Sequence, residues 1–492
     1  MFKSTEPLLT VQTLAIGATL IGFASIAIAV SGEYEALMAW WMVIFLLLPP
    51  LIWALNTSYV ALKTICLIAF TAQFVTVPIF YMDRDTFSWG HVKPFGFTAI
   101  EALPMLSKVA LFLVFLIVFF KVLYDLPISG CTAQRRSKKF QSSATQLTLW
   151  AVIVENTHSL KPGRNAWIYV GLIFLVISVA TVINLWMFSQ GISIVGVEPP
   201  RLPYRLSGIL HYLTRYIIPL LLGYLFWKTK RGFFPTAVLM GYGLILGVSS
   251  VSRSALAYVM LPVLLAAWCD KRWALLIFTS LGTTIGFSLV SFARNFVYIV
   301  IDGKTGALND TDVLCILINV LLDPDSPLGE VDFLLRAVVG IFNRMDGFEN
   351  MVMSHFYDPN AVLEPVKLLL GMIWRPLAPI DNALHSIQWQ GSVPPEGFFC
   401  GGVLLSNVVI LGNANLMWVI ASAVVVACTL VLLEKSAHRV TARYGLPDML
   451  ASSLIILLSI IFFNETGGSS IFLVPLLLLI VASLLPPLYR FN

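Results

Sequence analysis

The sequence predicts an all-α membrane protein, a polytopic helical bundle of about twelve transmembrane helices with a large extracytoplasmic loop after the ninth. Of its 492 residues, 58% are hydrophobic and 12% are charged, which is about half the charged fraction of soluble domains. The mean hydropathy is +0.86. Apolar runs of about 20 residues recur along the chain, the length that a helix needs to cross a bilayer, whereas a β-barrel would show shorter alternating segments.

Twelve segments have the length and composition of membrane spans. In order along the chain they are Leu8–Val30, Ala36–Leu55, Tyr59–Tyr81, Met105–Tyr124, Trp167–Ser189, Leu210–Trp227, Phe233–Val248, Ala255–Trp268, Trp273–Phe292, Leu416–Leu433, Met449–Phe463 and Ile471–Leu488. They divide the chain into helices 1–9 within residues 1–294, an extracytoplasmic part at 295–415, and helices 10–12 within 416–492. We expect the apolar stretch Gly397–Leu411 to be a re-entrant or interfacial helix that closes the extracytoplasmic part.

Clusters of basic residues follow helices 4, 6, 8 and 10. Their members are Arg135, Arg136, Lys138 and Lys139; Lys228, Lys230 and Arg231; Lys271 and Arg272; and Lys435, Arg439 and Arg443. Lys and Arg accumulate in the short cytoplasmic loops of membrane proteins. All four clusters lie on the cytoplasmic side if both termini are cytoplasmic, and residues 295–396 then lie outside. If Gly397–Leu411 crossed the membrane as a separate span, Lys435, Arg439 and Arg443 would lie on the extracytoplasmic side.

Several functional classes find no support in the sequence. No Asp or Glu lies near the middle of a predicted span, although ion-coupled transporters usually place carboxylates there. The six cysteines lack metal-binding spacing, so we expect no metal and no cofactor. The longest cytoplasmic segment, Asp125–Arg164, holds no phosphate-binding loop, and the net charge of +5 does not indicate a nucleic-acid partner.

A second group of arginines lies on the predicted outer side, against the positive-inside tendency. Its members are Arg201, Arg205, Arg215 (one turn after His211), Arg253 and Arg294. A guanidinium group offers a planar fork of donors that matches phosphate oxygens. Several of them converging at the outer membrane face would suit a lipid-linked diphosphate, with Arg201, Arg205, His211, Arg215 and Arg253 binding substrate. A lipid headgroup or a nearby carboxylate explains any single arginine well, whereas the whole set favours a shared anionic substrate.

The large loop is acidic and carries a few arginines. Between residues 295 and 396 there are five Lys or Arg and thirteen Asp or Glu. We expect Val331–His355 to be a helix with Arg336 and Arg344 on one stripe, since residues spaced by four share a helix face. Arg344 either contacts substrate or pairs with Asp346 or Glu349. His385 is a candidate proton acceptor, although a loop histidine can also be structural.

Gly247–Leu256 reads Gly-Val-Ser-Ser-Val-Ser-Arg-Ser-Ala-Leu, and Phe342–Glu349 reads Phe-Asn-Arg-Met-Asp-Gly-Phe-Glu. These two segments and the overall layout resemble the Wzy-type polymerases of bacterial surface polysaccharides, relatives of the O-antigen ligases in the glycosyltransferase C class. Gly247–Leu256 is similar to a short junction common in those proteins. Phe342–Glu349 is similar to the arginine-bearing segment of their large loop. Ser392–Phe399 lacks the His-Asn pair that ligases often carry before helix 10.

The resemblance implies an enzyme of the bacterial inner membrane. It would join oligosaccharide repeat units carried on undecaprenyl diphosphate, at the periplasmic face, by metal-independent inverting glycosyl transfer. Membrane lipids surround it, and a chain-length regulator would be a further partner. The residues expected to act in catalysis are Arg294, Arg336, Arg344, Asp346, Glu349 and His385.

Two alternatives stay open. A ligase would move the same glycan onto another acceptor, and the sequence does not reveal the acceptor. A flippase or other carrier of lipid-linked oligosaccharides would need no catalytic residues, but it should line a cavity with cationic side chains at mid-span.

Overall fold

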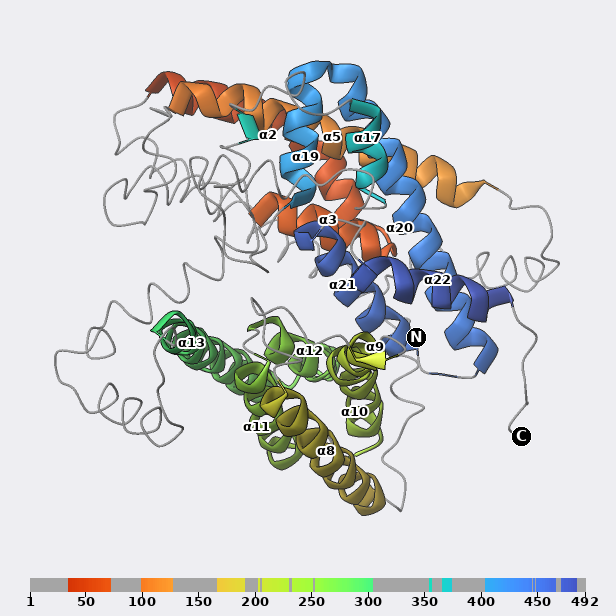
Figure 1. Cartoon of the computed structure of the whole chain (residues 1–492). Coiled ribbons are helices and arrows are strands. Elements are labelled where there is room, and N and C mark those ends of the chain that lie inside the picture. Colours follow the sequence, from red (N-terminus) through yellow and green to blue (C-terminus); the bar gives the residue numbers. More distant parts are fainter. Residues whose placement is uncertain are drawn as a thin grey trace. The chain divides into compact units, whose positions relative to one another are not determined.

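The computed structural model describes residues 34–71, 99–126, 166–190, 202–203, 206–229, 232–250, 253–303, 354–355, 365–373, 403–444, 446, 448–465 and 470–484. Every regular element in these ranges is helical, and none is a strand (Figure 1). The first predicted span, Leu8–Val30, and the predicted loop helix Val331–His355, apart from its last two residues, lie outside them.

Five of the described helices are long and apolar enough to cross a membrane. They are Pro104–Asp125, Ile168–Ser189, Leu206–Lys228, Trp273–Val290 and Leu416–Tyr444. Seven shorter apolar helices accompany them in the described part of the chain. The protein therefore has the helical, membrane-embedded character that the sequence predicts. The number twelve and the orientation of the termini stay predictions.

The chain forms two compact units that interleave along the sequence. Unit 1 combines N-terminal and C-terminal helices, and α20 lies at its centre, against α5, α22, α19, α21, α3 and α17 (Figure 1). The helices of unit 1 are α2 (Tyr34–Asn56), α3 (Val60–Thr71), α5 (Ala99–Asp125), α17 (Pro365–Gly371), α19 (Val403–Ala414), α20 (Leu416–Tyr444), α21 (Asp448–Glu465) and α22 (Ser470–Leu484).

Helices α5 and α20 lie side by side and run in the same direction. In the first half of α5, the Lys108 ammonium donates a hydrogen bond to Oδ1 of Asn413, which lies three residues before the start of α20. Near the end of α5, the ammonium of Lys435 on α20 reaches the carbonyl oxygen of Leu123 at 3.5 Å and lies 4.9 Å from the ring centre of Tyr124. Unit 1 is therefore built around two parallel helices from opposite ends of the sequence.

A very short connection joins α19 to α20. Only Asn415 separates the two helices, and its side chain caps α20 by accepting a hydrogen bond from the Met417 N–H at 2.9 Å. The described part of α19 has 12 residues, about 18 Å along the helix axis. Its residues from Leu404 to Leu411 are buried. The re-entrant character expected of Gly397–Leu411 stays a prediction.

A buried carboxylate ties α3 to α20. Glu434, which is 1% exposed, accepts hydrogen bonds from the backbone N–H groups of Val60 at 2.9 Å and Ala61 at 3.0 Å. The first N–H groups of a helix have no partner within it, and a carboxylate there also meets the positive end of the helix dipole. Glu434 therefore caps a helix that begins 374 residues earlier in the chain.

Unit 2 consists of consecutive helices, with α12 at its centre in contact with α11, α13 and α10. Its elements are α8 (Ala166–Ser189), α9 (Leu206–Tyr212), the π-helix η5 (Leu213–Ile217), α10 (Ile218–Lys228), α11 (Phe233–Ser249), α12 (Arg253–Cys269) and α13 (Trp273–Gly303). Figure 1 shows them from olive α8 to green α13.

Contacts fix the direction of the helices in unit 2. The rings of Tyr216 and Tyr258 lie 5.4 Å apart, and further along both helices the Trp227 indole N–H donates to the Pro262 carbonyl oxygen at 3.4 Å. The segment from η5 to α10 is therefore parallel to α12. Glycines of α13 show that it is parallel to α11, because Gly282 lies against Met240 and Gly286 against Leu244.

The close approach of α10 and α12 at Gly223 gives a testable prediction. A Cβ at this position would lie 2.7 Å from two ring carbons of Pro262, which cannot rotate away. Gly223→Ala should therefore lower the free energy of unfolding by about 1–3 kcal/mol. The measurement is unfolding of the purified protein in detergent.

Gly241→Ala on α11 is the matched control for Gly223→Ala. No atom lies within 4 Å of a Cβ placed at Gly241, so the gain in helix propensity should stabilise this variant by about 0.5–1 kcal/mol. Equal stabilities of the two variants would contradict the tight contact at Pro262.

The connection between α12 and α13 closes on a left-handed residue. Lys271 has a φ of 54°. The Arg272 N–H donates to the Ala267 carbonyl oxygen at 2.9 Å, the hydrogen bond that ends a helix in a Schellman turn. Glycine is the usual residue at the left-handed position because it has no Cβ. Here a lysine occupies it.

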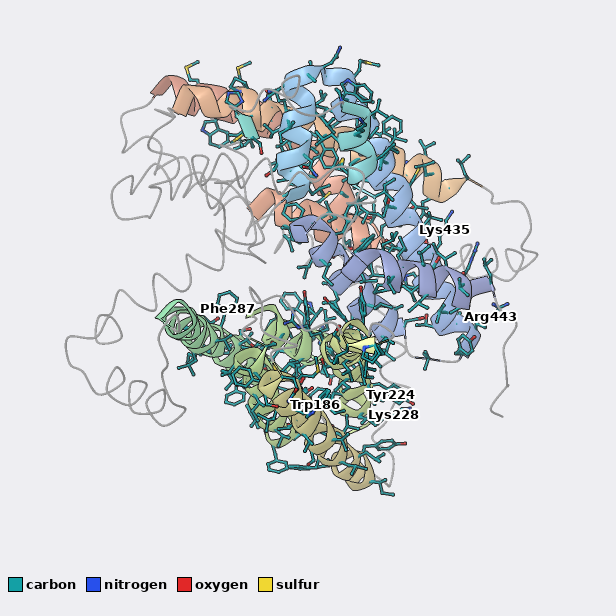
Figure 2. All side chains as sticks on the ribbon, in the orientation of Figure 1. Trp186, Tyr224, Lys228, Phe287, Lys435 and Arg443 are labelled. Carbon is teal, nitrogen blue, oxygen red and sulfur yellow. The ribbon has the colours of Figure 1, made fainter. Side chains whose placement is uncertain are left out.

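Two predicted helix ends are wrong. The span expected to stop at Phe292 continues as α13 to Gly303, so the backbone of Arg294 is inside a helix and is not its last residue. The span expected to stop at Leu433 continues as α20 to Tyr444, so Lys435, Arg439 and Arg443 are on a helix and not in a loop (Figure 2). In both cases polar residues end the apolar run, although they do not end the helix.

Candidate functional site

Four of the predicted site residues fall within the described part of unit 2. Arg215 is described with its side chain, and His211, Arg253 and Arg294 are placed by their backbones on α9, α12 and α13. The other predicted site residues lie outside the described ranges. They are Arg201, Arg205, Arg336, Arg344, Asp346, Glu349 and His385.

Arg215 is buried inside the helical bundle. Its side chain is 7% exposed, and Nη2 donates to the carbonyl oxygen of Ser250 at 3.3 Å. Ser250 follows the last residue of α11, where helix carbonyls lack partners within the helix. A guanidinium group carries five N–H donors, and one of them makes this contact. Arg215 is thus fixed beside the junction of α11 and α12.

A local distortion of the helix accompanies Arg215. Residues Leu213–Ile217 form a π-helix, in which the Ile218 N–H donates to the carbonyl oxygen of Leu213. Such wide turns are rare and often occur at functional sites. The rings of Tyr212 and Tyr216, on either side of Arg215 in the sequence, lie 5.9 Å apart. Arg215 lies within this wide turn, on the side of the helix that faces the α11–α12 junction, because its guanidinium contacts Ser250 there.

Arg253 is the first residue of α12. Its backbone is therefore at the same junction whose Ser250 carbonyl binds Arg215. The hydroxyls of Ser249 and Ser250 both donate to the Leu246 carbonyl oxygen, at 3.3 and 2.5 Å. These serines close the end of α11. The junction thus joins the predicted substrate residue Arg215 to the segment that contains Arg253.

The backbone of Arg294 lies toward the same end of unit 2. Gly286 on α13 contacts Leu256 on α12, and Leu256 is close to the start of α12. Arg294 follows Gly286 by about two helical turns, in the direction of the α11–α12 junction. We call this end, defined by Arg215, Ser250, Arg253 and Arg294, the arginine end of unit 2.

The opposite end of unit 2 carries two of the basic clusters. Because α10 is parallel to α12, Lys228 at the end of α10 and the Lys271–Arg272 connection after α12 both lie away from the arginine end. Lys228 lies 5.6 Å from the ring centre of Tyr224 (Figure 2). The geometry thus places these clusters together, as the positive-inside interpretation requires, and separates them from Arg215.

The arginine end combines features that suit an anionic group. A buried guanidinium keeps its charge at any physiological pH, and interactions with an anion are stronger away from water. The N-terminus of α12 brings the first backbone N–H groups of a helix, which have no acceptor within that helix, to the same junction. Arg215 lies about 13 Å along its helix from Leu206.

Two polar contacts in unit 1 were not predicted from the sequence. No partner was assigned to Lys108 or to Glu434 from the sequence. The structure instead pairs Lys108 with Asn413, and Glu434 with the start of α3. The polar residues themselves were the available signal, because buried polar groups need partners. The identity of a partner more than 300 positions away was not readable from helical periodicity.

Comparison of the chain with protein-family models, characterised proteins and solved structures found no match. The assignment of a function therefore depends on the chemistry of the residues.

Proposed function

We propose that this protein polymerises oligosaccharide repeat units carried on undecaprenyl diphosphate into a surface polysaccharide such as O-antigen, capsule or exopolysaccharide. The observation that carries the proposal is the buried Arg215, which is held at the α11–α12 junction beside the segment of Arg253. In the proposed topology, the enzyme lies in the bacterial inner membrane with both termini in the cytoplasm. The arginine end then faces the periplasm.

The leaving diphosphate gives the arginines their role in this proposal. Glycosyl transfer from a lipid-linked donor releases a diphosphate, whose negative charge grows in the transition state. Cationic donors placed where that charge develops lower the barrier without a metal ion. Arg215 and Arg253 would bind the diphosphate of the donor, and Arg294, Arg336 and Arg344 would stabilise it as it leaves.

The acceptor sugar also needs a base. Its hydroxyl must lose a proton as it attacks the donor, and Glu349, Asp346 and His385 are the candidates in the large loop. A carboxylate or an imidazole can accept this proton when it lies within hydrogen-bond reach. Holding two lipid-linked substrates together would supply much of the remaining rate enhancement.

A carrier of lipid-linked oligosaccharides is the second candidate, and the position of Arg215 along its helix favours it. The helix from Leu206 to Lys228 has 23 residues, and Arg215 lies nearer to its middle than to either end. A flippase would use such a cation to bind the diphosphate on its way across. A ligase would use the same arginine end as the polymerase and differ in its acceptor.

One assay separates these candidates. The purified protein is incubated in EDTA with lipid-diphosphate-linked repeat units, and the glycans are separated on a gel. A ladder of products is expected from a metal-independent polymerase. Unchanged repeat units would contradict the polymerase, and transport of the same units across proteoliposomes would then identify a carrier.

Arg344→Ala is expected to abolish the ladder while the protein still inserts and accumulates in the membrane. The reason is that Arg344 is a permanently charged group in a loop that membrane insertion does not need. Lys304→Ala, at another basic position of the same loop, is the control and should retain the ladder. A polymer of normal length from Arg344→Ala would remove Arg344 from the site without changing the proposed function.

A further inference from the structure

Lys108 occupies an unusual position in unit 1. It lies on α5 one turn after Pro104, where the apolar span begins. Its side chain is half-buried, and its ammonium group donates a hydrogen bond to Asn413 Oδ1. An ammonium group has three donors, so this contact uses one of them.

Asn413 is held so that its oxygen faces Lys108. Its Nδ2 donates to the carbonyl oxygens of Ser354 at 3.0 Å and His355 at 2.9 Å. Carbonyl oxygens only accept, so the amide must turn its nitrogen toward them and its oxygen toward the ammonium group. The position of the Lys108 charge is thus set by a side chain that is itself fixed at two points.

The stem of Lys108 is fixed as well. A Cβ built on Gly412 would lie 2.8 Å from Lys108 Cδ and 3.1 Å from Cγ. The lysine stem therefore packs directly on the backbone at the end of α19, where any larger residue would displace it. Much of the rotamer entropy that a free lysine would lose on binding a ligand is already lost here.

The charge of Lys108 has no carboxylate partner within the described part of the chain, where its hydrogen bond is to the neutral amide of Asn413. The other α5 lysine differs, because Lys121 is exposed and lies 5.2 Å from the ring centre of Trp53. A half-buried cation whose partner among the described residues is a neutral amide is costly unless an anion reaches it. A protein that fixes such a cation in one place has prepared a binding position.

We propose that Lys108 binds a phosphate group at this end of unit 1. Its position one turn inside the apolar span, about 6 Å along the helix from Pro104, is close to the depth of lipid headgroups. The anions attached to lipids at this depth are phosphates, and lysine binds phosphate as a point charge. The phosphate belongs either to a phospholipid headgroup or to a polyprenyl diphosphate. Only the polyprenyl diphosphate depends on the proposed function.

The test measures binding of defined lipids to the purified full-length protein in detergent. The probes are phosphatidylglycerol and undecaprenyl diphosphate, with dioleoylglycerol and undecaprenol as controls that lack phosphate. Lys108→Gln should weaken binding of at least one phosphate lipid about tenfold or more, whereas Lys108→Arg should restore it. Lys121→Gln, on the same helix, should bind as the wild type does.

A second measurement uses the wild-type protein and so does not depend on folding of a variant. Lys108 is acetylated with a water-soluble reagent, and its modification is followed by mass spectrometry. Both phosphate-free lipids should leave acetylation unchanged, and the phosphate lipid that binds should protect Lys108 but not Lys121.

The two probes separate the two sources. Loss of phosphatidylglycerol binding alone identifies a structural phospholipid, and loss of undecaprenyl diphosphate binding identifies a substrate contact. The phospholipid result would leave Lys108 as a phosphate site even if the polymerase assay gave no ladder. Binding of both phosphate lipids within twofold of the wild type by folded Lys108→Gln, or equal acetylation with and without them, would overturn the proposal.

Discussion

Glu434→Ala is expected to lower the free energy of unfolding by about 3 kcal/mol or more. The variant removes the acceptor of two buried backbone N–H groups at the start of α3, and each unsatisfied buried donor costs about 1–3 kcal/mol. Helix α3 would also lose a negative charge at the positive end of its dipole. The free energy of unfolding is measured on the purified protein in detergent, with the loss of helix content as the signal.

Variants at the same position and on the same helix make this prediction specific. Glu434→Gln keeps one oxygen acceptor and replaces the other with a donor. Its free energy of unfolding should therefore lie between that of Glu434→Ala and that of the wild type. Thr429→Ala removes a hydroxyl that donates a hydrogen bond within α20, to the Val425 carbonyl oxygen at 2.9 Å. It should lower the free energy of unfolding much less than Glu434→Ala does. Equal stabilities for Glu434→Ala and Thr429→Ala would show that the cap of α3 contributes little.

Arg215→Met is expected to reduce polymer formation about 100-fold or more while the protein remains folded. Methionine fills much of the same volume in the bundle but supplies neither charge nor donors. Removing one fixed donor from a site of developing negative charge typically costs a factor of about 100–1,000 in rate. Polymer formation is measured by the rate at which the ladder appears at saturating donor.

The matched control for Arg215→Met is Arg443→Met on α20. Arg443 donates to the Ser483 carbonyl oxygen at 2.8 Å, on a basic stretch of unit 1 (Figure 2). It is exposed, and its loss should leave the rate nearly unchanged. Arg215→Lys separates charge from geometry, because lysine keeps the charge but loses the planar fork. A normal rate for Arg215→Met would remove Arg215 from the proposed diphosphate site.

Helices were predictable from the sequence because apolar runs dominate it. The predicted spans from Ala36–Leu55 onward overlap described helices, since residues that face lipid or core must be apolar for about 20 positions. Helix ends were harder to predict. Helix α20 continues past Glu434 because the following polar residues find partners on α5 and α22, and hydropathy does not detect such contacts.

The arrangement of the helices was not readable from the pattern. The pairing of α5 with α20 joins segments about 300 residues apart, and no periodicity encodes which apolar faces meet. The arginine end was foreseen in part, because Arg215 and Arg253 were selected as residues that oppose the positive-inside tendency. The contact that holds Arg215 beside the segment of Arg253 is to the backbone carbonyl of Ser250, and backbone acceptors carry no signature in the sequence.

At Lys271, the residue that would be most stable in the folded turn differs from the residue that favours correct membrane insertion. A left-handed residue with a side chain costs about 1 kcal/mol or more relative to glycine. In the predicted topology the connection of α12 and α13 is cytoplasmic, and basic residues in such a connection favour its staying on that side as the two helices enter the bilayer. On that topology, Lys271 would direct membrane insertion at the cost of a less stable turn in the folded protein.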